Sequence, residues 1–170
     1  MAEIMTIGLT HIKMGAVGGD GGMGTSLTPI GDGRTLAGTA RLAKDEDELT
    51  EFYAEEVDDP IYASLKKGKT RLEWTIVDFT ASELARIMGG KDNGGVWEAP
   101  ATAPDIEQSI EVLTKTNLKI ELVRCKIQAN FDTTLGRAEL GQVRVVATVL
   151  NPTKAATPPY KISKYTPPSS

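Results

Sequence analysis

Residues 75–95, TIVDFTASELARIMGGKDNGG, pass from a strand pattern through a short helix pattern into a glycine-rich exit. The strand pattern begins earlier, in KTRLEWTIVDF at 69–79. There Leu72, Trp74 and Ile76 alternate with polar or charged residues, as in a strand with one buried face. This part of the chain therefore predicts a half-buried strand followed directly by one short helix.

The helix is predicted at about 81–88. A threonine can cap its start, and a glutamate three residues later completes a capping box. Apolar residues line one face, and two glycines follow the last turn. Isolated helices below about 12 residues are marginal in water, so we expect it to pack on a sheet edge or an open sandwich end. The residues assigned to this structural helix are Thr80, Glu83, Leu84, Ile87 and Met88.

Composition favours a β-rich protein. The 170 residues suit one domain, and 17 glycines with only 5% aromatic residues indicate an aliphatic core and many loops. Strand patterns also occur at 4–14, 35–43, 138–150 and, as a short edge strand, 161–165. In 117–131 the apolar alternation changes phase near Leu122, which predicts a bulge or a strand that passes from one sheet to another. A hairpin connection is expected at 131–137.

We expect a single domain over 1–170 with three irregular parts. Residues 1–34 combine a first strand with a glycine-rich arm, since eight glycines lie between positions 15 and 33. Residues 152–170 form a loose, proline-bounded C-terminal segment. Residues 43–70 form a charged excursion.

The excursion carries nine acidic residues before a cluster of bases. Because alternating segments flank it, we expect a long hairpin-like projection. The alternative is a solvated charged face without further role. Its charged candidates for an interface are Asp45, Glu46, Asp47, Glu48, Glu51, Glu55, Glu56, Asp58, Asp59, Lys66, Lys67 and Lys69.

Net charge argues against a protein that binds nucleic acid by neutralising phosphates, since the chain carries a charge of −4 at pH 7. One cysteine, Cys125, permits no intrachain disulfide, and we expect it to be a small buried hydrophobe. No secretory signal is visible, and no run of about 18 apolar residues predicts a membrane helix. We expect a protein made in the cytoplasm, without membrane insertion.

The sequence offers little chemistry. The single histidine, His11, and one cysteine cannot form a zinc site within one chain or a catalytic triad. Residues 19–24, GDGGMG, match a dinucleotide-binding pattern, but breakers including Pro29 follow where a helix must begin. The acidic run lacks the alternating ligands of a calcium loop. No catalytic, cofactor or metal residue is assigned, and we do not expect an enzyme.

Three segments in this order resemble the bacteriophage major tail tube proteins. They are DDPIYASLKKGKTRLEWTIVDF at 58–79, the helix TASELARIMGG at 80–90, and the closing pair KIELVRCKIQAN (119–130) and GQVRVVATVLNPT (141–153). The resemblance covers about 35–155. It implies a β-sandwich or half-open barrel with one short helix, an extended loop and flexible arms.

The family also implies a function. Six copies close into a ring through a continuous sheet, and rings stack into the tail tube that conducts DNA into the host cell; the related tubes serve contractile injection and type VI secretion. The excursion would reach the adjacent ring, and the glycine-rich arm would order on assembly. Implied partners are other copies of the chain and the tape measure, tail terminator and baseplate or tip proteins, with a sheath protein left open. DNA would pass through the lumen without specific binding.

Two hypotheses accompany this resemblance. The charges of the excursion would provide electrostatic complementarity between stacked rings. The helix would close the open side of the sandwich and face the tube exterior, with Leu84, Ile87 and Met88 buried. The alternatives left open are another self-assembling virion component, such as a decoration or tail terminator protein, and a monomeric ligand-binding β domain. The expected location is the virion tail, assembled in the cytoplasm of a bacterial host.

Overall fold

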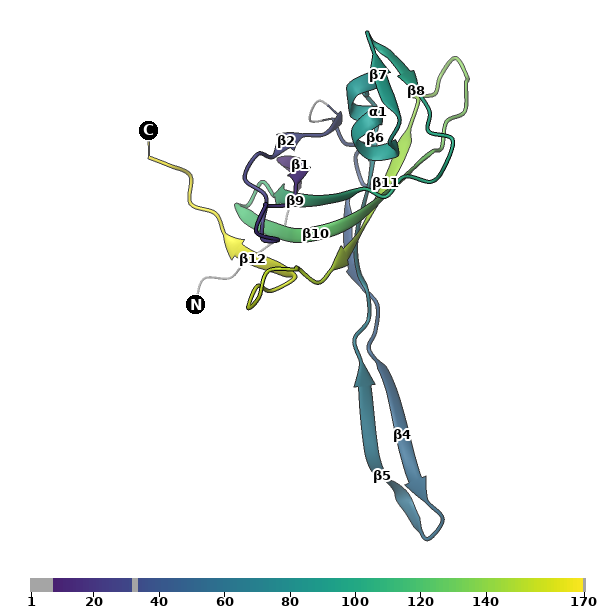
Figure 1. The fold of residues 1–170 in the computed structure, drawn as a ribbon, viewed down its shortest axis with the longest axis vertical. Helices are drawn as coiled ribbons and strands as arrows, with labels where there is room; N and C mark the ends of the chain where they lie inside the picture. The colour runs from purple at the N-terminus through teal and green to yellow at the C-terminus, as the bar shows by residue number, and fades with distance from the viewer. Residues whose placement is uncertain (1–7, 32–33, 170) are drawn as a thin grey trace.

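A computed structural model describes residues 8–31 and 34–169 and has a mainly β fold (Figure 1). Strands account for 48% of the residues and helix for 6%, so the predicted class is confirmed. The elements are β1 (His11–Ala16), β2 (Thr28–Pro29), β3 (Arg41–Lys44), β4 (Glu48–Ala54), β5 (Val57–Lys66), β6 (Thr70–Ile76), α1 (Ala81–Met88), β7 (Lys91–Asn93), β8 (Val96–Glu98), β9 (Glu107–Leu113), β10 (Leu118–Phe131), β11 (Val143–Leu150) and β12 (Tyr160–Lys164).

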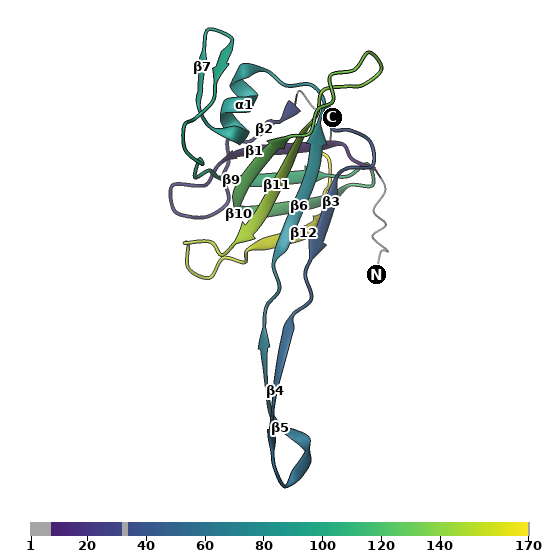
Figure 2. The same cartoon turned by 90° about the vertical axis from the view of Figure 1, so that its right-hand side faces the viewer.

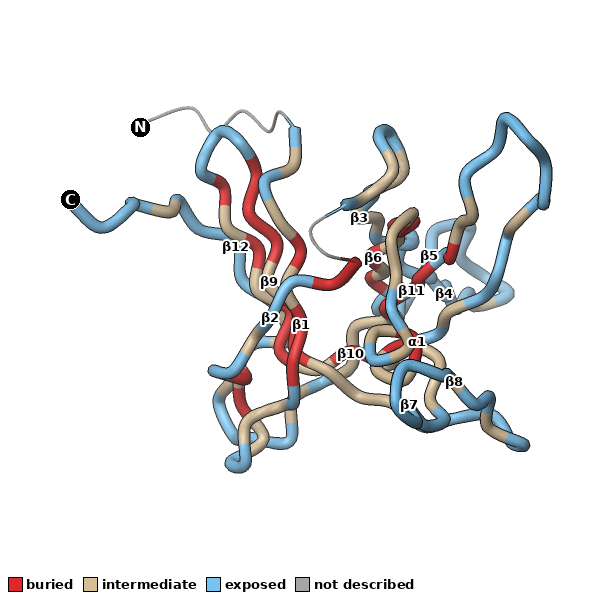
Figure 3. Tube along the Cα trace, turned by 90° about the horizontal axis from the view of Figure 1, so that it is seen from above, coloured by how far each residue is buried: buried red, intermediate tan, exposed pale blue. Residues whose placement is uncertain are grey.

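One eight-stranded antiparallel sheet forms the body, with the order β2-β1-β9-β10-β11-β6-β3 and β12 also paired with β10. The long strand β10 joins two layers, which lie opposite one another when seen from above (Figure 3). Its first part, 118–122, pairs with β12, and its second part, 124–131, pairs with β11. The two layers are joined along β10 and are open on the opposite side.

The predicted phase change in β10 is confirmed. The register with β9 shifts between Leu122 and Cys125, and consecutive residues Leu122 and Val123 are both buried. A shift of this kind bends a strand and lets it turn from one layer into the other. The core that lies between the layers includes Met14, Trp74 and Ile110, each at most 1% exposed.

Helix α1 packs at one end of the sandwich, against β10 and the short hairpin β7–β8 (Figure 1). The prediction that it closes the open side is wrong, because no residue of α1 lines the cavity on that side. The capping box of α1 is present as predicted: Glu83 N donates to Thr80 Oγ1, and Thr80 N donates to a Glu83 carboxylate oxygen. Leu84 and Ile87 are buried in the core, but Met88 is only partly buried, which corrects the expected three-residue buried face. Met88 lies at the last turn, beside a hollow that leaves part of it exposed. The helix is therefore a packed structural element.

Arg86 connects α1 to strands β1 and β2. Its guanidinium donates to the carbonyl oxygens of Met14 (2.6 Å), Thr28 (3.4 Å) and Pro29 (3.2 Å). Burial lowers the pKa of Arg86, because the cation loses contact with water. Gly89 ends the helix with φ of +74°, and a Cβ there would lie 2.7 Å from Pro104. A glycine is thus required by both conformation and space.

Three predicted strands have different bounds in the structure. The strand expected at 138–150 begins only at Val143, and the connection expected at 131–137 is the longer loop 132–142. The strand expected at 4–14 lies partly outside the described residues, and the described strand β1 continues to Ala16. Of the strand expected at 35–43, only β3 at its end forms, apart from a single bridge between Thr35 and Ile76. Between Thr35 and β3, the Thr39 hydroxyl donates to Leu36 O and accepts from Thr75 N. The chain therefore turns at this point and does not continue as a strand beside β6.

The described part of the glycine-rich segment is docked on the body, which corrects the expectation of a free arm. Gly24 N donates to Ser109 Oγ (2.9 Å), and Asp20 forms an ion pair with Lys154 (2.8 Å). Strand β2 pairs with β1 in the same segment. The C-terminal part is held similarly, because β12 forms the predicted edge strand one residue earlier than expected.

Candidate assembly surface

The predicted projection is confirmed as the two-stranded hairpin β4–β5, which extends away from the body (Figures 1 and 2). It leaves the body from the neighbouring strands β3 and β6. At a rise of about 3.3 Å per residue, the ten residues of β5 span roughly 33 Å. We name the segment 48–66 the projecting hairpin.

The base of this hairpin is fixed by its own contacts. Asp45 N donates to Lys69 O (2.8 Å), and Arg71 forms an ion pair with Asp45 (3.1 Å). Asp47 accepts hydrogen bonds from Gly68 N (2.9 Å) and from the Lys44 ammonium, and both lower the pKa of the Asp47 carboxyl. The two strands are therefore held together where they leave the body.

Beyond its base, the projecting hairpin exposes large apolar side chains. Phe52 is 50% exposed and Tyr62 is 64% exposed, with their ring centroids 5.8 Å apart. Both faces carry such residues, because Phe52 pairs with Tyr62 on one face and Leu49 pairs with Leu65 on the other. The complete exposed set is Leu49, Phe52, Tyr53, Val57, Ile61, Tyr62 and Leu65.

The exposed area is large enough to form one side of an interface. At about 100 Å² for each half-exposed large side chain, the seven residues expose roughly 700 Å². Monomers rarely expose apolar patches above about 300–600 Å², and a standard interface buries about 800 Å² per partner. An isolated two-stranded hairpin is also marginally stable in water. This surface has the area and composition of a contact that another molecule covers.

The predicted charged candidates fall into two groups. At the base, Asp45, Asp47 and Glu48 are paired within the chain, the last with Lys66 at 3.9 Å. Lys67 lies over the Tyr160 ring at 6.0 Å, and Glu51 accepts from the Tyr53 hydroxyl. Among residues 8–31 and 34–169, no ion pair is formed by Glu46, Glu55, Glu56, Asp58, Asp59 and Lys69.

The free charges therefore concentrate toward the tip, where Glu55, Glu56, Asp58 and Asp59 lie at or next to the turn between β4 and β5. Sequence reasoning identified these charges but missed the exposed apolar residues between them. The alternating segments that flank the excursion predicted a hairpin, but the sequence of 48–66 carried no sign of whether its apolar side chains are covered.

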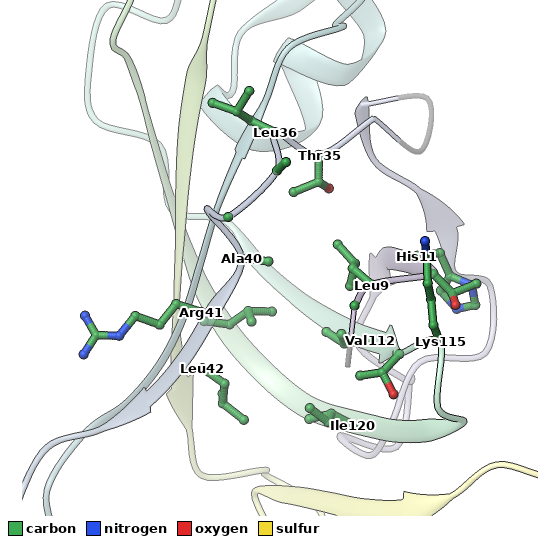
Figure 4. A pocket seen from close by; sticks show the side chains of 16 residues that line it. Leu9, His11, Thr35, Leu36, Ala40, Arg41, Leu42, Val112, Lys115 and Ile120 are labelled. Atoms are coloured by element: carbon green, nitrogen blue, oxygen red, sulfur yellow. The ribbon is translucent and has the colours of Figure 1, made fainter. Parts of the chain in front are cut away.

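A second feature is a cavity of about 600 Å³ on the open side of the sandwich. Leu9 and Val112 lie across it from Ala40, with Leu42 and Ile120 at its lower side, and the Arg41 side chain points away (Figure 4). Apolar walls and this volume are typical of small-molecule sites.

The structure places the two residues considered for chemistry, His11 and Cys125, on different strands. His11 contacts Glu111 (3.2 Å) on the outer face of the sheet. Cys125 is buried as expected, and burial raises the pKa of its thiol to about 12. Within the described part of the chain, no group of His, Cys, Asp and Glu has the arrangement of a metal site. In that same part, no helix has the length and apolarity needed to span a membrane.

No protein-family model matches the chain, and a search of curated proteins gives no match. What is established is thus a mainly β, sandwich-like protein with a projecting apolar hairpin.

Proposed function

We propose that this protein is a self-assembling structural subunit of a bacteriophage tail tube, without enzymatic activity. Rings of six copies stack into a tube in the virion tail, which conducts DNA into the host cell without binding it specifically. The subunit contacts its own copies, and at the tube ends the tape measure, terminator and baseplate or tip proteins. Assembly takes place in the host cytoplasm.

The projecting hairpin carries this proposal. Its seven exposed apolar residues extend beyond the body, and the hairpin is fixed at its base by contacts within the chain. A long, apolar, preorganised projection is suited to contact a neighbour at a distance, as between stacked rings. The resemblance of residues 35–155 to tail tube proteins supplies the class of assembly.

Removal of the hairpin tests the proposal. Asp47 is joined to Lys67 through two glycines, which deletes 48–66 and leaves the hydrogen bond from Asp45 N to Lys69 O in place. We expect the intact chain to form rings or tubes in negative-stain electron microscopy, with a light-scattering mass for one ring near six times 18.2 kDa, about 109 kDa. The deleted chain is expected to fold but not to stack.

Two controls separate length from surface chemistry. A full-length variant with serine at Leu49, Phe52, Ile61 and Tyr62 keeps the hairpin and is expected to lose stacking. Ile162→Ser removes an exposed apolar residue elsewhere, on β12, and is expected to retain stacking. A lasting 18.2 kDa monomer of the intact chain at high concentration would contradict the proposal, as would tubes from the deleted chain.

The cavity on the open side favours a second candidate function, a monomeric domain that binds a small apolar ligand. In that case the intact chain remains monomeric, and its melting temperature rises with ligand concentration. Ala40→Phe would fill the cavity and remove this response. Assembly without any ligand-dependent melting temperature would argue against this candidate.

A further inference from the structure

We infer that the projecting hairpin docks on the opposite end of a second copy of this chain, on an apolar surface that we name the distal patch. The inference rests on the proposed function and identifies the receiving surface within it. The distal patch consists of Phe79, Trp97, Phe131, Leu135 and Leu140.

Strand pairing places this patch at the far end of the layer from which the hairpin leaves. Where β6 begins, Thr70 pairs with Lys44, next to the hairpin base. Where β6 ends, Ile76 pairs with Val143, and Val143 pairs in turn with Phe131. The loop 132–142 and α1 therefore lie at one end of the molecule and the hairpin at the other, as two perpendicular views show (Figures 1 and 2).

The distal patch has an aromatic centre and an exposed apolar rim. Phe131 contacts Trp97 edge-on, with ring centroids 5.9 Å apart, and lies 6.4 Å from Phe79. Leu135 is 96% exposed and Leu140 is 62% exposed. Both lie in a loop that is closed by hydrogen bonds between Thr133 and Gln142. Apolar side chains held out on a closed loop are available to a partner.

A hollow beside the patch provides room for large side chains. Its volume is about 570 Å³, and its walls include Met88, Trp97 and the proline-bounded segment 99–104. The aromatic pair Phe52 and Tyr62 on the hairpin is of the kind that anchors interfaces in such hollows. The loop 132–142 carries Asp132, Arg137 and Glu139, so its charge is mixed and apolar area is the basis of the pairing.

Head-to-tail contact follows from this placement. The two surfaces differ and lie at opposite ends, so each copy can give its hairpin to one neighbour and receive the hairpin of another. Contacts of this heterologous type extend into open stacks when they do not close. Over its two faces together the hairpin exposes roughly 700 Å², so a neighbour that encloses both faces covers close to the about 800 Å² that one side of a stable interface buries. A second copy is therefore a sufficient occupant.

Chemical cross-linking tests the pairing. Tyr62→Cys and Leu140→Cys introduce one reactive thiol on the hairpin and one on the distal patch, both at exposed positions. Native Cys125 serves as an internal control, since its buried thiol has a pKa raised to about 12 and should not react with maleimides. Assembled protein is treated with a short bismaleimide and run on a denaturing gel.

The double variant is expected to give a ladder of dimers, trimers and higher chains, and each single variant a monomer band. The matched control, Tyr62→Cys with Ile162→Cys, is expected to give no ladder. Dimers of Tyr62→Cys alone would overturn the inference in favour of hairpin-to-hairpin contact. Large particles without a ladder in the double variant would also overturn it, while leaving the proposed function in place. Monomers in every sample would reject both.

Discussion

The sharpest test of the fold concerns α1, because two of its side chains, Leu84 and Ile87, belong to the core. Ile87 is 1% exposed and belongs to the core, so Ile87→Ala removes three carbons from a packed interior. Buried Ile→Ala changes cost about 2–5 kcal/mol. For a chain of this size each 1 kcal/mol lowers the melting temperature by about 2–4 °C, so a cost of about 3 kcal/mol predicts a fall of about 6–12 °C.

The assay is calorimetric unfolding of Ile87→Ala beside Ser82→Ala, which changes an exposed position on the same helix. Surface changes usually stay within about 0.5 kcal/mol, so the control should melt within about 2 °C of the parent. A fall of under 2 °C in Ile87→Ala would show that α1 is a surface helix and refute its role in the core. Leu84→Asp, which buries an unpaired charge, should abolish soluble expression for the same reason.

Three further outcomes are expected. Two basic side chains hydrogen-bond Glu107 and lower its pKa from 4.5 to about 2. They therefore stabilise the fold above about pH 4.5 and progressively less toward pH 2. The melting temperature of Glu107→Gln should lie below that of the parent at neutral pH and converge with it near pH 2. Arg86→Gln should lower the free energy of unfolding in urea by about 2 kcal/mol. A change under about 0.5 kcal/mol would show that the hydrogen bonds from Arg86 to β1 and β2 do not stabilise the fold. Replacing Lys66, Lys67 and Lys69 by Glu should impair tube growth more than folding, and unchanged tubes at low salt would reject a role for charge in stacking.

Local chemistry made much of the fold predictable. The capping box and the glycines after Met88 specify α1 within a few residues, and the alternation around Trp74 specifies β6. The phase change in β10 could be read from the sequence, because two overlapping apolar alternations require a bend. Each of these signals lies within about a dozen residues.

Other features depend on contacts between distant parts of the chain. The glycine-rich segment reads as an arm, yet Gly24 is held by Ser109, 85 positions away. Strand β9 was missed because Glu107, Gln108 and Glu111 interrupt a short apolar pattern that Ile110 and Val112 alone sustain. Local propensity does not encode these pairings.

The same limitation applies to the assembly surface, and it changes the weight given to charge. Large apolar residues in a strand usually face a core, but neither face of the projecting hairpin is covered by the body, so its apolar residues form an exposed surface. The acids nearest the body are already paired with bases of the same chain, and these pairs fix the base of the hairpin. The charges of the excursion that show neither an ion pair nor a ring or hydroxyl contact within the described residues are the four tip acids and, at the base, Glu46 and Lys69. In our proposal the apolar residues therefore supply most of the affinity, and the free charges adjust orientation and the rate of encounter.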